Sequence, residues 1–226
     1  MAQMLGAERQ QRFLRNLGFF EPTPVEMTEA PTGKPLVPRR WPAVTAATVA
    51  FGHGLAASPL HLASAYATLA NDGRRVRPTL VHRKQPVQGE QVLSPQAAAA
   101  SRDLLRGVVT RGTAKAAEVT GYSVGGKTGT ADKPKPGGGY FKSRVVSTFA
   151  AIYPTDKPEY VLVVSLDEPS VSAAGGGELR TAGATAAPVA AALIQRLTPM
   201  LGLKPEGAAL PEIGPRASDA VRVSSR

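Results

Sequence analysis

The chain has 226 residues, enough for one large domain or two small ones with a sizeable core. An apolar content of 42% excludes a disordered polymer, and the absence of cysteine excludes disulfides, cysteine-ligated zinc and thiol nucleophiles. No apolar run approaches the ~18 residues of a membrane span, and no signal-peptide core begins the chain. We therefore expect the chain to lack a signal or membrane anchor of its own.

The net charge of +10 is concentrated in residues 74–150, which hold fourteen basic and four acidic side chains. Such a block is either a solvated basic face or a surface for an anionic partner: nucleic acid, an anionic polymer or a carboxylate. A nucleic-acid surface would interleave aromatic residues with the basic ones. The aromatic residues of the block are few, namely Tyr122, Tyr140, Phe141 and Phe149. We therefore expect no nucleic-acid partner.

Apolar periodicity and end signals predict four helices, at Ala7–Leu17, Ser58–Asn71, Ser94–Thr110 and Ala184–Leu201. The two central helices each begin with a serine that can cap and a proline suited to the first turn. The segment Phe19–Pro42 holds six prolines, which exclude a regular helix or a central strand.

Strands are predicted at Arg75–Lys84, Gln91–Leu93, Ser143–Tyr153 and Glu159–Leu166, with a further extended, glycine-punctuated stretch at Thr120–Ala131. A loop is expected at Lys133–Gly139, a hairpin turn at Pro154–Pro158 and a flexible loop around Gly175–Gly177. We expect Glu159–Leu166 to be more buried than its hairpin partner. One domain is predicted over residues 1–202, and Leu203–Arg226 is predicted to be a disordered tail.

The segment Gly121–Thr128 matches the phosphate-loop expression G-x4-G-K-[ST], but its context excludes that function. A phosphate loop needs an apolar strand before it and a helix that starts at the Lys-Thr pair. Lys115–Thr120 is not apolar, and two prolines and three glycines soon follow Thr130. The same residues also fit a strand-borne Lys-Thr-Gly element.

In the strand interpretation, a substrate peptide lies antiparallel along the strand, and Gly129 allows close approach because it has no Cβ. Alternation places Lys127 and Gly129 on one face and Thr128 and Thr130 on the other. Lys127 supplies a positive charge for a carboxylate and for proton transfer, so we assign it the catalytic role. Thr128, Gly129 and Thr130 are the predicted substrate-binding residues, with the Thr130 N–H aimed at a developing oxyanion. A glycine-rich turn with a surface lysine is the alternative.

The surrounding sequence resembles the C-terminal half of the transpeptidase domain of class B penicillin-binding proteins of the division type. The resembling blocks occur in family order between Met1 and Gly202: Ala50–Leu55, Ser58–Ala63, Ala65–Gly73, Gly125–Ala131, Val163–Pro169 and Gly183–Pro188. The resemblance implies an α+β fold, with an antiparallel sheet, three of whose five strands are present, flanked by helices. It implies cross-linking of peptidoglycan stem peptides at the periplasmic face of the inner membrane, as part of a full-length protein.

The same resemblance implies β-lactam binding, possible division-protein partners and no cofactor. The family also needs Ser-x-x-Lys, which supplies nucleophile and base, and Ser-x-Asn, both N-terminal to Lys-Thr-Gly. None of the serines of the chain has a lysine three positions later, and neither Asn16 nor Asn71 follows a serine by two. We expect the chain to begin just downstream of the nucleophile half and to be inactive by itself, since acylation needs an activated nucleophile. A fragment, an interrupted gene and a split enzyme all remain open.

Two other hypotheses remain: a non-catalytic module that binds cell-wall peptides or a division partner, and a basic nucleic-acid binder, which the aromatic content disfavours. No metal site is predicted, because His53, His61 and His82 are scattered along the chain. The acidic pair Asp167-Glu168 ends a strand before a proline and is interpreted as structural, since acid–base pairs need opposed geometry.

Overall fold

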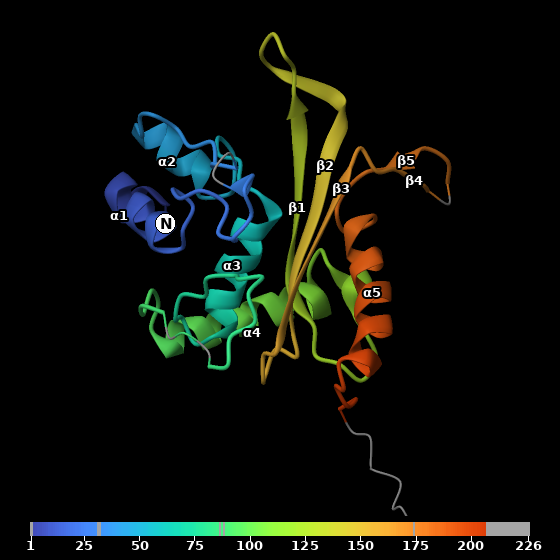
Figure 1. The fold of residues 1–226 in the computed structure, drawn as a ribbon. Helices are drawn as coiled ribbons and strands as arrows, with labels where there is room; N and C mark the ends of the chain where they lie inside the picture. The colour runs from blue at the N-terminus through green and yellow to red at the C-terminus, as the bar shows by residue number, and fades with distance from the viewer. Residues whose placement is uncertain (1, 31–32, 86, 88, 174, 207–226) are drawn as a thin grey trace, which may run out of the picture.

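The computed structural model describes residues 2–30, 33–85, 87, 89–173 and 175–206. A three-stranded antiparallel sheet in the order β1-β2-β3 forms its centre, and helices lie on both sides (Figure 1). The strands are β1 (Gly125–Pro134), β2 (Tyr140–Tyr153) and β3 (Tyr160–Asp167). The predicted α+β class and antiparallel sheet are confirmed.

The helices are α1 (Ala2–Asn16), α2 (Ala43–Val49), α3 (Pro59–Ala70), α4 (Pro95–Arg111) and α5 (Ala186–Met200), with a 3-10 turn η2 (Lys115–Ala117). The hydroxyl of Ser58 accepts the N–H of His61, and that of Ser94 accepts the N–H of Ala97, as the capping signals predicted. Helix α1 begins earlier than expected and is broken at Gly6, whose φ is 75°. Helix α2 was not predicted.

The main core lies between α5 and the sheet. Helix α5 approaches closely because Ala186, Ala187 and Ala190 form its buried stripe, and Ile194 extends the stripe by one turn. Phe149 of β2 projects into this layer and is completely buried. On the other face, α3 contacts β2 and β3. Helix α4 contacts β1, and its Val109 belongs to the main core. The first residues of β1 therefore lie between α4 and β2.

The prediction of strands at Arg75–Lys84 and Gln91–Leu93 is wrong, because the described residues there form no strand and an isolated bridge joins Arg74 to Gln91. Residues of this stretch donate hydrogen bonds to carboxylates of the proline-rich segment, where a strand would pair with a neighbouring strand. The carboxylate of Glu21 accepts two hydrogen bonds from Arg75, at 3.1 and 2.6 Å. The carboxylate of Glu26 accepts from the hydroxyl of Thr79 and the N–H of Leu80.

Strand β3 is less buried than β2, which contradicts the expectation from its apolar sequence. Strand β2 is central, whereas β3 pairs on one side only among the described residues. Strand β1 continues through Lys133 to Pro134, so the predicted loop is restricted to residues 135–139. Residues 175–177 lie in the turn between the short strands β4 (Val171–Ser172) and β5 (Glu178–Leu179).

Leu203–Glu206, the start of the predicted tail, contacts the body of the protein. Leu203 packs on the main core, and the N–H of Glu206 donates to the carbonyl of Gly121 at 2.7 Å. The packed part of the chain thus extends past Gly202, and the rest of the predicted tail, residues 207–226, lies outside the described residues. Among the described residues, every helix is too short or too polar to traverse a lipid bilayer.

Candidate substrate-binding strand

The four residues Lys127-Thr128-Gly129-Thr130 lie consecutively in β1 and pair with Ala150, Phe149, Thr148 and Ser147 of β2. The other edge of β1 pairs with no strand among the described residues. In an antiparallel sheet such an edge leaves alternate backbone N–H and C=O groups unpaired, so it can bind an extended peptide. The motif therefore lies on a strand with a free edge, and β1 does not lead into the helix that a phosphate loop requires.

The two threonines face the α5 side of the sheet. The hydroxyl of Thr130 accepts the N–H of Ala182 at 2.9 Å, just before α5. The hydroxyl of Thr128 shares a hydrogen bond of 2.8 Å with that of Thr113, just after α4. Both hydroxyls thus hold β1 against its neighbours, a role that the sequence did not suggest. Thr130 keeps its O–H free to donate, because it is the acceptor in the contact with Ala182.

Lys127 is exposed, and its ammonium donates to the carbonyl of Thr128 at 2.8 Å. No ion pair of Lys127 occurs within the described residues. The ammonium is therefore available to a carboxylate, whereas Lys133 on the same strand is neutralised by Asp167 and Glu168, at 2.9 and 2.7 Å. Hydrogen bonds from Lys133 to these carboxylates raise the pKa of the lysine. The acidic pair thus fastens the ends of β1 and β3, in agreement with its structural interpretation.

The glycines of the motif have different roles. A Cβ on Gly126 would lie 2.5 Å from both the ring of Phe149 and the carbonyl oxygen of Ala150, so Gly126 is required by packing. A Cβ on Gly129 would meet only the carbonyl oxygen of Thr148, at 4.0 Å. Because no described residue occupies the space over Gly129, that surface is open to a ligand.

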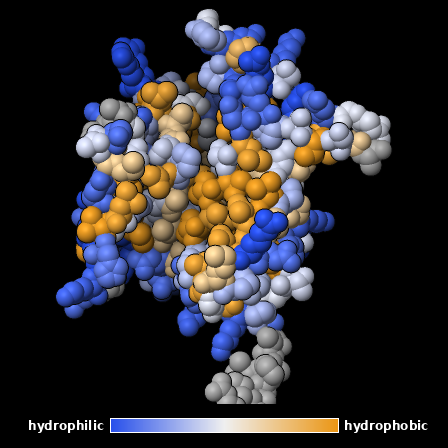
Figure 2. Space-filling model, turned by 45° about the vertical axis from the view of Figure 1, so that its right-hand side comes forward, coloured by the Kyte–Doolittle hydropathy of each residue, from blue (hydrophilic) through white to orange (hydrophobic). Residues whose placement is uncertain are grey.

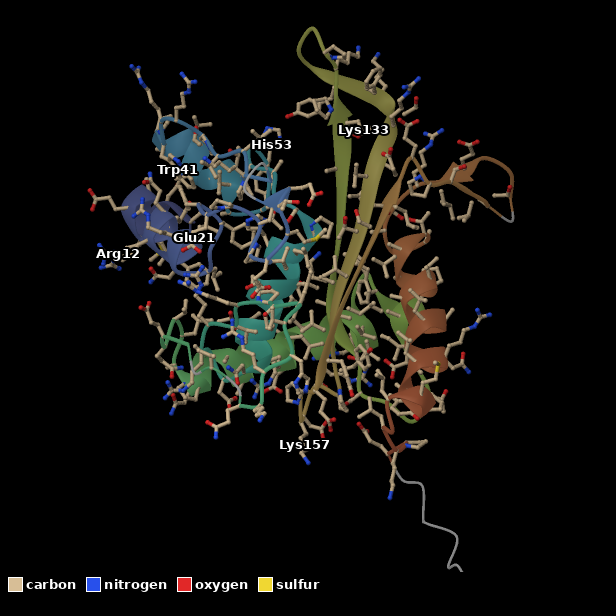
Figure 3. All side chains as sticks on the ribbon, in the orientation of Figure 1. Arg12, Glu21, Trp41, His53, Lys133 and Lys157 are labelled. Carbon is tan, nitrogen blue, oxygen red and sulfur yellow. The ribbon has the colours of Figure 1, made fainter. Side chains whose placement is uncertain are left out.

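The histidines serve separate purposes and form no metal cluster with acidic residues in the described part of the chain. His61 is buried and bonds the hydroxyl of Ser58 and the carbonyl of Glu21, at 2.8 and 3.0 Å. His53 is exposed, and its ring lies 5.8 Å from that of Tyr140 (Figure 3). Sequence reasoning missed the contact between His53 and Tyr140, since it joins segments distant along the chain.

A groove of about 1390 Å³ lies next to β3, away from Lys127. Its walls include Tyr160 and Val161 of β3, the end of α3 and residues of the segments 21–26, 75–85 and 89–90. A smaller pocket of about 140 Å³ lies between the start of α3 and the sheet, lined by Thr148 beside Gly129.

An antiparallel sheet backed by an alanine-rich helix, with Lys-Thr-Gly on an edge strand, is the arrangement of penicillin-recognising serine acyltransferases. Residues 1–195 match the penicillin binding protein transpeptidase domain. The chain therefore belongs to this family, and its relatives assign it to the class B proteins of the division type.

The relatives include the probable peptidoglycan D,D-transpeptidase FtsI of Caulobacter vibrioides, which is 39% identical over 215 residues, 90% of this chain and 36% of that protein. Stage V sporulation protein D of Bacillus subtilis is 30% identical over 217 residues, 91% of this chain and 32% of that protein. Penicillin-binding protein 3 of Mycobacterium tuberculosis, solved with ampicillin, is 32% identical with a TM-score of 0.78. That match covers 94% of this chain and 49% of the solved one. The chain spans about a third of the curated relatives' length.

Proposed function

We propose that β1 is the strand on which a serine D,D-transpeptidase holds its peptide substrate, with Lys127 and Thr130 in contact with the reacting group. In this proposal a serine attacks the carbonyl of a D-Ala-D-Ala terminus, D-alanine leaves, and an amine of a neighbouring stem peptide resolves the acyl-enzyme. A β-lactam occupies the same strand and traps the serine. The observation that carries the proposal is the unpaired edge of β1 beside an unneutralised Lys127 and the open surface of Gly129.

Each residue has a distinct role in this step. Lys127 attracts the substrate carboxylate and assists proton transfer near the nucleophile. The N–H of Thr130 stabilises the developing oxyanion, and its hydroxyl donates to the carboxylate. Thr128, whose hydroxyl is engaged by Thr113, contributes through its backbone and through the position of the strand. No cofactor takes part.

The nucleophile is supplied from outside these 226 residues, since no Ser-x-x-Lys occurs within them. The supplying half of the domain fills the groove beside β3 and pairs with the free β3 edge. This edge is apolar and β-branched from Tyr160 to Val164, and Figure 2 shows hydrophobic residues gathered over this side of the molecule. We place the complete protein at the periplasmic face of the inner membrane, with division proteins as partners.

The test is acylation by a fluorescent penicillin after co-expression with the part of the Caulobacter relative that precedes the matched segment. Lys127→Ala is expected to slow acylation at least about tenfold, as for the loss of one polar transition-state contact. Lys157→Ala, in the turn between β2 and β3, is the matched control and is expected to acylate at the wild-type rate (Figure 3). Acylation of the Lys127 variant at the wild-type rate contradicts the assignment. Binding of cell-wall peptides with no acylation in the reconstituted domain favours the non-catalytic module instead.

A further inference from the structure

The direction of a peptide bound to β1 follows from the position of Lys127. Lys127 lies near the amino end of β1, so a peptide whose terminal carboxylate pairs with it extends along the free edge toward Pro134. This direction is antiparallel to β1, as a regular edge ladder allows. The four-residue step from Thr130 to Pro134 spans about 13 Å at the usual strand rise. The amino-terminal part of the bound peptide therefore reaches the far end of β1.

Three exposed aromatic rings lie at that end. Tyr140 pairs with Pro134, its ring centroid lies 5.8 Å from that of His53, and His53 lies 6.4 Å from Phe51. Phe51 and Tyr140 are 76% and 48% exposed. Figure 3 shows His53 between α2 and the β1–β2 hairpin. The row thus joins the turn after α2 to the start of β2, and none of its members belongs to the main core.

A row of exposed rings suits a ligand with an apolar face and polar edges, because aromatic side chains combine an apolar body with polar groups. A pyranose ring has this character, and a peptidoglycan stem peptide is joined to a sugar at its amino end. Three or four extended residues upstream of the reacting bond span about 10–13 Å, which matches the distance from Thr130 to Pro134.

We propose that Phe51, His53 and Tyr140 form a sugar subsite that stacks on the pyranose ring at the amino end of the peptide held by β1. The proposal rests on the proposed function, because the place of the sugar depends on Lys127 binding the opposite end of the peptide. It gives the exposed row a role in substrate recognition: the protein would select a peptide still attached to its glycan strand.

The test compares two ligands by isothermal titration calorimetry on this chain co-expressed with the preceding part of the Caulobacter relative, with the serine of the partner's Ser-x-x-Lys replaced by alanine to prevent turnover. One is an N-acetylmuramyl pentapeptide ending in D-Ala-D-Ala, and the other is the same peptide with an acetyl group in place of the sugar. The sugar is expected to strengthen binding about fivefold, the size of one aromatic contact. Tyr140→Ala and, separately, His53→Ala are expected to abolish this advantage without changing the affinity for the acetylated peptide.

Phe141→Ala is the matched control, because the ring of Phe141 is covered by Arg144 at 4.7 Å and Lys135 at 5.8 Å. This variant is expected to retain the fivefold advantage. If the wild type binds the two ligands with equal affinity and Lys127→Ala weakens the binding of both, the sugar subsite is overturned and the proposed function stands. Absence of any Lys127-dependent binding by either ligand would overturn both.

Discussion

The two glycines on either side of the Lys127-Thr128 pair give opposite predictions when each is replaced by alanine. In Gly126→Ala the new methyl group would lie 2.5 Å from both the fully buried ring of Phe149 and the backbone carbonyl oxygen of Ala150. Overpacking of this kind costs about 1–3 kcal/mol, a large part of the ~5–15 kcal/mol that stabilises a domain. In Gly129→Ala the methyl group enters open space, and alanine in a strand is favoured over glycine by about 0.5–1 kcal/mol.

Urea denaturation and penicillin acylation of the reconstituted domain separate the two effects. Gly126→Ala is expected to lower the denaturation midpoint. Gly129→Ala is expected to keep or raise the midpoint and still to slow acylation, because its methyl group occupies the surface on which the ligand lies. Wild-type acylation by Gly129→Ala would refute the placement of the ligand over Gly129. An unchanged midpoint for Gly126→Ala would refute the packing argument.

Two further predictions concern stability. Glu21→Gln is expected to cost about 1–2 kcal/mol at pH 7, because the Arg75 side chain, only 9% exposed, loses its charged partner. The hydrogen bond from Arg75 lowers the pKa of Glu21 below its ordinary 4.5. The stabilisation is therefore fully present above pH 4.5 and is lost as the pH falls through the lowered value. The prediction is contradicted if the urea midpoints of the wild type and of Glu21→Gln differ equally at pH 7 and at pH 3. The 226-residue chain alone is expected to be marginally folded or prone to aggregation through the free edge of β3, and to be rescued by the co-expressed half. Circular dichroism melting with light scattering tests this, and a monomer melting cooperatively above about 60 °C would refute it.

Features fixed by neighbouring residues were predictable from the sequence. The Ser-Pro pairs before α3 and α4 located both helix starts to the residue, since a cap and a first-turn proline act within one turn. The alternation of β1 likewise anticipated that Thr128 and Thr130 share a face, because side chains in a strand alternate regardless of what they meet.

Features decided by distant partners were not predictable. The stretch after α3 has a strand-like composition, but Arg75 bonds Glu21 of the proline-rich segment, and no neighbouring strand is present among the described residues. The apolar sequence of β3 suggested a deeply buried strand, whereas burial depends on its position at the edge of the described sheet. The contact of His53 with Tyr140 has no local signal at all.

The central claim is that this chain carries the substrate strand and that the acylated serine lies outside its 226 residues. Intact mass spectrometry after exposure to penicillin tests it most directly, first on the chain alone and then on the co-expressed pair. The chain alone is expected to keep its mass, and in the pair the penicilloyl adduct is expected on the other polypeptide and to depend on Lys127. A stoichiometric adduct on any serine of this chain would contradict the account.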